Sequence, residues 1–137
     1  MSHVCTAVAL FHRGGCWWTT ECYEEIPDMP ETTTDLYRRG SAASPRLDHV
    51  RVGKDIDSFE RDNALWVRAR SGGVSTFSRP GFGQHWWRLP QGYIYPDALY
   101  VVNDHGNHYS WEPHVDMPLA EYVALLAAVH PHFVKTT

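Results

Sequence analysis

The sequence has few cysteines, and none of them form a pair with a redox or metal-binding spacing. Its three cysteines, Cys5, Cys16 and Cys22, are odd in number and contain no CxxC motif. Small secreted domains that depend on disulfides normally carry an even set of cysteines. We therefore expect no disulfide framework, and the composition favours a reducing compartment.

Long apolar runs are also missing. No stretch of the chain approaches the roughly 20 apolar residues that a membrane-spanning helix needs. The N-terminus shows no basic segment followed by an apolar run, so we expect no signal peptide. These absences predict a protein that is made in the cytoplasm and does not enter a membrane. They also fit contact-dependent delivery into the cytoplasm of a recipient cell.

Positive charge is scarcer than negative charge. The 137 residues include 12 Lys and Arg against 16 Asp and Glu, a net charge of −4. Proteins that grip nucleic acid neutralise its phosphates with Lys and Arg, so the charge balance does not favour nucleic acid as a partner. The cations are nearly all arginines, because Lys54 and Lys135 are the only lysines. Arginine's planar fork suits two-pronged contacts with phosphate or carboxylate.

Three common catalytic motifs are absent. The chain contains no GxSxG nucleophile elbow and no phosphate-binding P-loop. Gly81-Phe82-Gly83 is not followed by a third glycine at the dinucleotide-binding spacing. A Rossmann-type site is therefore not supported.

Nine histidines raise the question of a metal site. His105 and His108 are close in sequence, and His49, His85 and His114 could join them. Metal sites normally combine tight ligand pairs on ordered elements with Cys or carboxylate ligands. No second close pair supports His105 and His108, so we predict no metal site.

The apolar pattern predicts mostly short strands and one helix. Gly72-Gly73 breaks or turns the chain between two strands, as in an ordinary hairpin. Only residues 119–130 show a helical period, with Asp116 as a plausible N-cap and Pro131 as the stop. The expected strands cover residues 4–11, 17–23, 36–38, 65–69, 74–78, 86–89, 99–102 and 108–111. This pattern predicts one α+β domain dominated by antiparallel sheet, with residues 1–34 as an N-terminal extension.

Three short strand motifs carry a family resemblance. They are Leu36-Tyr37-Arg38, the segment 72–78 with sequence GGVSTFS, and Asn107-His108-Tyr109-Ser110. In this order they resemble the ADP-ribosyltransferase toxin fold. The chain looks most like the small NAD-dependent cytotoxic effectors of Pseudomonas that are exported by type VI secretion. The similarity runs from Leu36 to about Val129 and includes the segments 45–50 and 94–99.

The resemblance implies a fold and an NAD site. Two small, mostly antiparallel sheets with one C-terminal helix would form a cleft for NAD within residues 35–130. Arg38 would contact a phosphate or ribose of NAD, although the motif leaves Arg39 as an alternative. Ser75 and Thr76 would order the cleft and bind the nicotinamide ribose, and residues 108–109 would hold the nicotinamide.

The resemblance also implies catalytic roles. His108 and Ser75 would act at the nicotinamide ribose, and Tyr109 would stack on the nicotinamide. The reaction passes through a cationic, oxocarbenium-like state, which a nearby carboxylate stabilises. Glu112 is the candidate for that carboxylate.

The sequence thus predicts a toxin that binds NAD as substrate. It would transfer ADP-ribose to a macromolecular acceptor in a recipient cell, or cleave NAD. A cognate immunity protein would block the cleft in the producing cell. Two alternatives are a ribonuclease toxin that uses His108 as base, and a non-enzymatic binding or immunity module. Steep salt dependence of RNA binding would favour the ribonuclease, and harmless expression without nucleotide binding would favour the module.

Overall fold

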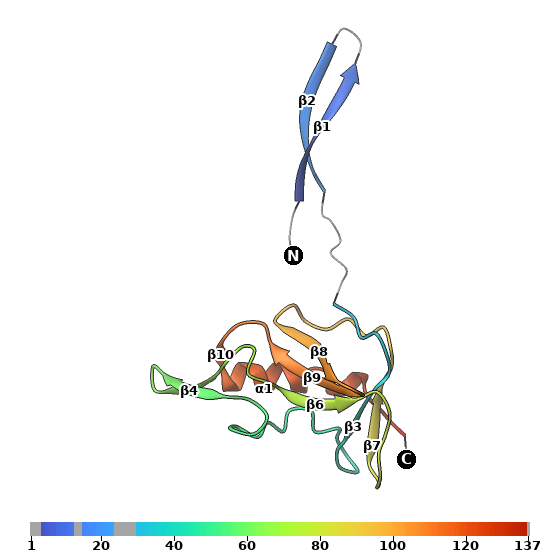
Figure 1. The fold of residues 1–137 in the computed structure, drawn as a ribbon, viewed down its shortest axis with the longest axis vertical. Helices are drawn as coiled ribbons and strands as arrows, with labels where there is room; N and C mark the ends of the chain where they lie inside the picture. Colours follow the sequence, from blue (N-terminus) through green and yellow to red (C-terminus); the bar gives the residue numbers. More distant parts are fainter. Residues whose placement is uncertain (1–3, 13–14, 24–29, 137) are drawn as a thin grey trace.

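The computed structural model describes the backbone of residues 4–12, 15–23 and 30–136, and the side chains of residues 30–136 (Figure 1). In chain order the elements are β1 (Val4–His12), β2 (Gly15–Tyr23), β3 (Leu36–Arg39), β4 (Ser58–Arg61), β5 (Ala64–Val67), β6 (Val74–Phe77), β7 (Trp86–Leu89), β8 (Leu99–His105), β9 (His108–Pro113), β10 (Met117–Pro118), α1 (Leu119–Ala127), a 3₁₀ helix (His130–His132) and β11 (Val134–Lys135).

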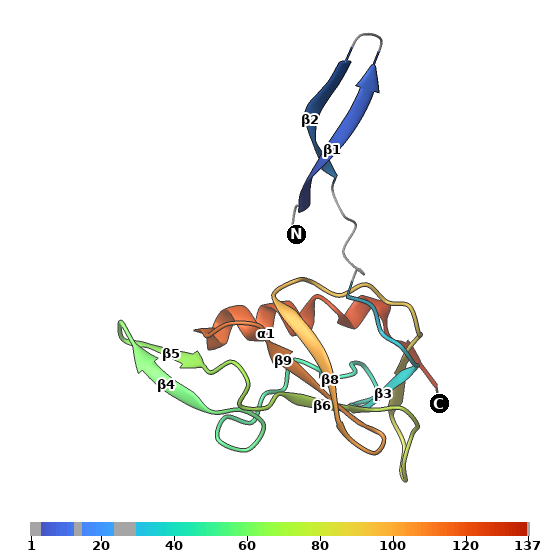
Figure 2. The same ribbon diagram turned by 45° about the horizontal axis from the view of Figure 1, so that its top comes forward.

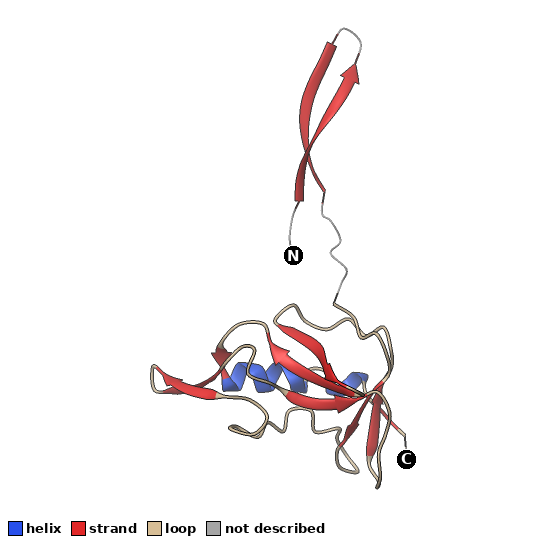
Figure 3. Cartoon of the chain, viewed as in Figure 1, coloured by secondary structure: helices blue, strands red, loops and turns tan. Residues whose placement is uncertain are grey.

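The strands after β2 form two antiparallel sheets (Figure 3). A six-stranded sheet has the order β11-β7-β3-β6-β9-β8, and a three-stranded sheet has the order β10-β5-β4. The predicted α+β class, with two antiparallel sheets and a C-terminal helix, is confirmed. No described helix has the length and apolar character needed to cross a membrane.

The first two strands form a separate two-stranded sheet. β1 and β2 pair antiparallel, from Val4 opposite Tyr23 to His12 opposite Gly15. This pairing confirms the strands predicted at 4–11 and 17–23. Residues 13–14 and 24–29 of the predicted N-terminal extension lie outside the described residues.

Helix α1 lies along one face of the six-stranded sheet (Figures 1 and 2). Val74 on β6 and Trp111 on β9 pair across the sheet and are fully buried. Tyr122 of α1 is also fully buried, and burial raises the pKa of its phenol. Its hydroxyl donates to the Trp111 carbonyl at 2.6 Å and accepts from the Val74 amide at 3.2 Å. One side chain therefore fastens the helix to two neighbouring strands.

We expect Tyr122→Phe to lower the free energy of unfolding by about 1–3 kcal/mol, because it leaves a buried carbonyl and a buried amide without their partner. Thermal melting followed by circular dichroism measures the change. Tyr37→Phe, which removes a hydroxyl from a half-buried tyrosine of β3, is the matched control and should cost less than about 0.5 kcal/mol. Equal melting temperatures for both variants would contradict this role of Tyr122.

The hairpin predicted around Gly72-Gly73 is wrong. β5 pairs with β4 and β10, whereas β6 pairs with β3 and β9 in the other sheet. The two glycines carry the chain between the sheets through a narrow passage. A Cβ on Gly73 would lie 1.9 Å from the Trp111 carbonyl oxygen, and one on Gly72 would lie 2.4 Å from the Asp55 carbonyl oxygen. Glycine is required there for close backbone approach as well as for the positive φ of Gly72.

The true partner of β5 is β4, which sequence reasoning missed. Asp62 and Asn63 between them both have positive φ, 51° and 60°, as a type I′ hairpin turn requires. Asp116 was expected to cap the helix, but Pro118 occupies the N-cap position. The Asp116 carboxylate instead accepts the amide of Ala69 at 2.8 Å, so it joins the loop before α1 to the residues after β5.

Candidate functional site

Ser75 is the residue at which the predicted site comes together. The pairing of β6 with β9 sets Phe77 opposite His108 and Ser75 opposite Ser110. Because side chains alternate along a strand, these four residues share one face of the sheet. The Ser75 Oγ lies 2.7 Å from His108 Nε2, and the Phe77 ring packs edge-on against the His108 ring with centroids 5.6 Å apart.

His108 is oriented by Asp104. The His108 Nδ1 lies 2.5 Å from Asp104 Oδ1. Burial opposes ionisation of Asp104, but its hydrogen bond to His108 and the charges of His108 and His105 outweigh this and lower the pKa of the carboxyl. An ionised carboxylate only accepts hydrogen bonds. His108 is therefore assigned a proton on Nδ1, which leaves the Nε2 lone pair to accept the Ser75 hydroxyl.

A β-bulge brings Asp104 to His108. The register of β8 against β9 shifts between Asn103 and His105, so Asp104 is the unpaired extra residue. The Asn103 side-chain amide donates to the carbonyls of Gly106 and His108, at 2.9 and 3.0 Å, and holds the turn closed. The strand end is thus shaped to place a carboxylate beside the imidazole.

Arg38 reaches Ser75 from the strand on the other side. β3 pairs with β6 at one position, Tyr37 with Phe77. Just past that pair, the Arg38 guanidinium donates from Nη1 to the Ser75 carbonyl at 2.9 Å, and from Nη2 to the Arg46 carbonyl at 3.2 Å. Ser75 thus contacts Arg38 through its carbonyl and His108 through its hydroxyl. The structure brings Arg38, Ser75 and His108 into contact through Ser75, although Tyr37, and not Arg38, is the β3 residue that shares the His108 face of the sheet.

The surroundings of Arg38 are rich in positive charge. Burial lowers the pKa of Arg38; Asp55 opposes this shift, and Arg51 and Arg46 add to it. Asp55 is already paired with Arg51, with Oδ1 and Nη2 2.9 Å apart. The buried Nε of Arg38 has no hydrogen-bond partner among the described residues. Arg38 therefore lies near two further guanidinium groups, and the carboxylate that opposes them is already paired with Arg51, an arrangement that favours an anionic ligand.

The loop after β3 that contains Arg46 is held at two points, Ser41 and Asp48. The Trp87 indole donates to the Ser41 carbonyl at 2.9 Å, and the Asp48 amide donates to His130 Nε2 at 3.3 Å. Burial lowers the pKa of His130, an effect that Asp48 opposes. A neutral imidazole can accept the Asp48 amide, so both contacts keep the loop against the sheet and the Arg46 carbonyl in reach of Arg38.

The structure distinguishes Arg38 from Arg39. Arg39 is exposed, and its Nε donates to the Gln84 carbonyl at 3.3 Å. Its guanidinium lies beside Gly83, where an added Cβ would come within 2.5 Å of Nη2. Arg39 therefore faces the loop before β7, and Arg38 is the arginine at Ser75.

Thr76 occupies a structural position. It is fully buried, its hydroxyl donates to the Tyr109 carbonyl at 3.1 Å, and it accepts the Trp111 indole at 3.0 Å. Both bonds join β6 to β9 on the core face, opposite to Ser75. We therefore leave Thr76 out of the groups proposed to touch NAD.

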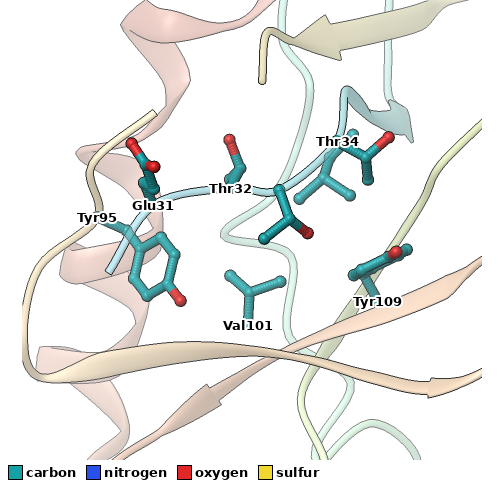
Figure 4. A pocket seen from close by; sticks show the side chains of 8 residues that line it. Glu31, Thr32, Thr34, Tyr95, Val101 and Tyr109 are labelled. Atoms are coloured by element: carbon teal, nitrogen blue, oxygen red, sulfur yellow. The ribbon is translucent and has the colours of Figure 1, made fainter. Parts of the chain in front are cut away.

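Tyr109 lies on the face of β9 opposite to His108. It lines a small pocket with Val101 of β8, Tyr95 and the segment 31–34 (Figure 4). The cavity measures about 70 Å³, far below the roughly 300–1,000 Å³ of sites for drug-sized ligands. The predicted stacking of Tyr109 on nicotinamide beside His108 is not supported by this geometry.

Glu112 is also separated from His108. It lies four residues further along β9, a span of roughly 13 Å in an extended strand. Its side chain is buried, and its Oε1 accepts the Tyr100 hydroxyl at 3.1 Å. The carboxylate nearest the Ser75–His108 pair is therefore that of Asp104.

Sequence reasoning missed Asp104 because the strand that begins at residue 99 was expected to end at residue 102, whereas β8 runs to His105. One signal could have found it. A carboxylate that stands four residues before a candidate catalytic histidine, across the short Gly106-Asn107 turn, is placed beside it when the hairpin closes.

Comparison with known proteins gives one result. The family model described as Tse2 ADP-ribosyltransferase toxin matches residues 28–135, most of the chain. No curated protein and no solved structure matches. The match includes all the residues that meet at Ser75.

Proposed function

Since the chain belongs to the Tse2 ADP-ribosyltransferase toxin family, we propose that it binds NAD at Ser75 and breaks the bond between nicotinamide and ribose. The observation that carries this proposal is the double contact of Ser75, with Arg38 through its carbonyl and with His108 through its hydroxyl. The ADP-ribosyltransferase toxin family agrees with the first of the three sequence hypotheses.

Two parts of the site would bind different parts of NAD. The arginine-rich side, with Arg38, Arg46 and Arg51, supplies positive charge for the diphosphate of NAD. The Ser75–His108–Asp104 chain of hydrogen bonds supplies a hydroxyl and a base for the nicotinamide ribose. NAD would therefore span from β3 to the β8–β9 turn.

The chemistry follows from the direction of the hydrogen bonds. The carbon–nitrogen bond breaks, and its electron pair leaves with nicotinamide, so positive charge develops on the ribose. A nucleophilic atom of the acceptor then bonds to the ribose carbon. Its proton passes to the Ser75 oxygen as the Ser75 proton moves to His108 Nε2. Asp104 stabilises the resulting imidazolium and holds the ring in place.

The acceptor is either a macromolecule, which gives ADP-ribosylation, or water, which gives NAD cleavage. In both cases the protein would act in a recipient cell after delivery by a type VI secretion route. The producing cell would need an immunity protein that covers Ser75 and His108.

We expect Ser75→Ala to lower the rate of nicotinamide release from NAD by about a hundredfold or more, the usual contribution of one proton-transfer step. The control is Ser78→Ala, which removes a hydroxyl three residues further along the chain. The assay separates nicotinamide by chromatography, with and without a bacterial lysate as acceptor source. If the Ser75→Ala enzyme were as active as Ser78→Ala, the proposed proton transfer through the Ser75 hydroxyl to His108 would be ruled out.

A further inference from the structure

The β8–β9 turn carries a cluster that the proposed reaction does not fully use. Asp104, His105 and His108 each offer one donor atom, and these atoms lie within 4.8 Å of one another. Within the part of the chain that the structure describes, no other group of three His, Cys, Asp or Glu side chains meets that condition. The sequence spacing of His105 and His108 does not by itself predict a third ligand beside them. The β-bulge at Asp104 places the carboxylate there.

The donor atoms are the same in both histidines. The Nδ1 of His105 lies 3.1 Å from Asp104 Oδ1, and the Nδ1 of His108 lies 2.5 Å from the same oxygen. The two imidazole rings are stacked, with centroids 4.9 Å apart. Ligands of a tetrahedral zinc ion at its usual bond lengths are separated by about 3.4 Å. Small side-chain rotations would therefore open the cluster enough to admit the ion.

The exposure of the cluster suits such an adjustment. The side chain of His105 is 77% exposed and that of Asp104 is 40% exposed, while His108 is only 18% exposed. An ion can reach the site from solvent, and His105 can turn toward it at little cost. Two imidazoles and one carboxylate suit zinc, whereas magnesium prefers oxygen ligands alone.

We propose that Asp104, His105 and His108 bind one Zn²⁺ ion, and that this ion switches off the Ser75–His108 pair. The fourth position would hold water, as in zinc sites with three protein ligands. The regulatory half of this inference rests on the function proposed above; the metal site itself does not.

The inhibition follows from the tautomer of His108. Without metal the proton sits on Nδ1, and Nε2 accepts the Ser75 hydroxyl. Zinc needs the Nδ1 lone pair, so the proton on Nδ1 leaves and the neutral ring carries its proton on Nε2 instead. That Nε2–H donates to the Ser75 oxygen and can no longer accept its proton. Proton transfer from the Ser75 hydroxyl then has no base to accept the proton.

Calorimetric titration of Zn²⁺ into the chelator-treated full chain tests the site. We expect one ion per chain for the wild type, and at least tenfold weaker binding for His105→Ala. His114→Ala is the control, since His114 is exposed just after β9 and outside the cluster; it should bind within twofold of wild type. No saturable binding, or equal binding by His105→Ala and wild type, would overturn the site.

Nicotinamide release measured across a Zn²⁺ series tests the switch. We expect the half-inhibitory concentration to rise at least tenfold in His105→Ala, no inhibition by Mg²⁺, and recovery on adding a chelator. Zinc that binds through His105 without slowing the reaction would overturn the switch. Binding that depends on His105 in a protein with no reaction on NAD would support the metal site and sink the proposed function alone.

Discussion

His108→Ala is expected to reduce nicotinamide release by a factor of about 10² to 10⁴, the range that a positioned acid–base group contributes. The substitution removes the hydrogen-bond partner of the Ser75 hydroxyl. It also leaves Asp104 without the imidazole that lowers its pKa. Single-turnover kinetics at saturating NAD would show the loss in the chemical step.

The matched control for His108 is His114→Ala. Both histidines belong to the same stretch of chain, but His114 packs its ring 4.9 Å from Tyr100 at the far end of β9. It should keep at least half of the wild-type rate. Similar losses in the two variants would mean that the stretch matters for folding rather than that His108 matters for chemistry.

Arg38→Lys should weaken NAD binding at least tenfold, although it keeps the charge. Lysine has no planar fork, so it cannot donate to the Ser75 and Arg46 carbonyls in the way that Nη1 and Nη2 do. For the same reason lysine cannot make a two-pronged contact with the diphosphate of NAD. Loss of one hydrogen bond between a charged donor and this ligand would cost about 1.5–3 kcal/mol, and 1.4 kcal/mol is a factor of ten. Fluorescence or calorimetric titration with NAD measures the change.

Arg39→Lys is the paired control, because Arg39 is exposed and contacts only the Gln84 carbonyl among its described hydrogen bonds. It should bind NAD within twofold of wild type. Loss of stability is a second explanation for a defect in Arg38→Lys, and Tyr122→Phe separates the two. That variant should melt earlier and still bind NAD normally below its melting temperature. If Arg39→Lys loses more affinity than Arg38→Lys, the assignment of the arginine is wrong.

Local patterns predicted most strands because each has enough β-branched, aromatic or alternating residues to be recognised alone. They could not predict partners. Residues 65–69 and 74–78 look like two arms of a hairpin, but β5 pairs with β4 across the Asp62-Asn63 turn, and β6 pairs with β9 through the buried Val74 and Trp111. Short β4 was missed because Ser58–Arg61 is polar and half exposed.

In the site, too, individual residues could be predicted from the sequence, but their arrangement in space could not. Arg38, Ser75 and His108 were predicted through the resemblance, and the structure brings them together. Thr76, Tyr109 and Glu112 stand next to them in sequence, yet strand alternation and strand length carry them to the core, the opposite face or the far end. Asp104 was missed because a one-residue shift in register decides which side chain faces His108.

The most direct test of the central claim, that Arg38, Ser75 and His108 form one NAD site, is calorimetric titration of NAD into the purified chain. The account predicts saturable binding of one NAD per chain. Affinity should fall at least tenfold in Arg38→Lys and in His108→Ala, and stay within twofold of wild type in Arg39→Lys and His114→Ala. Folded wild-type protein that gives no heat with NAD, or binding that neither Arg38→Lys nor His108→Ala weakens, would contradict the account.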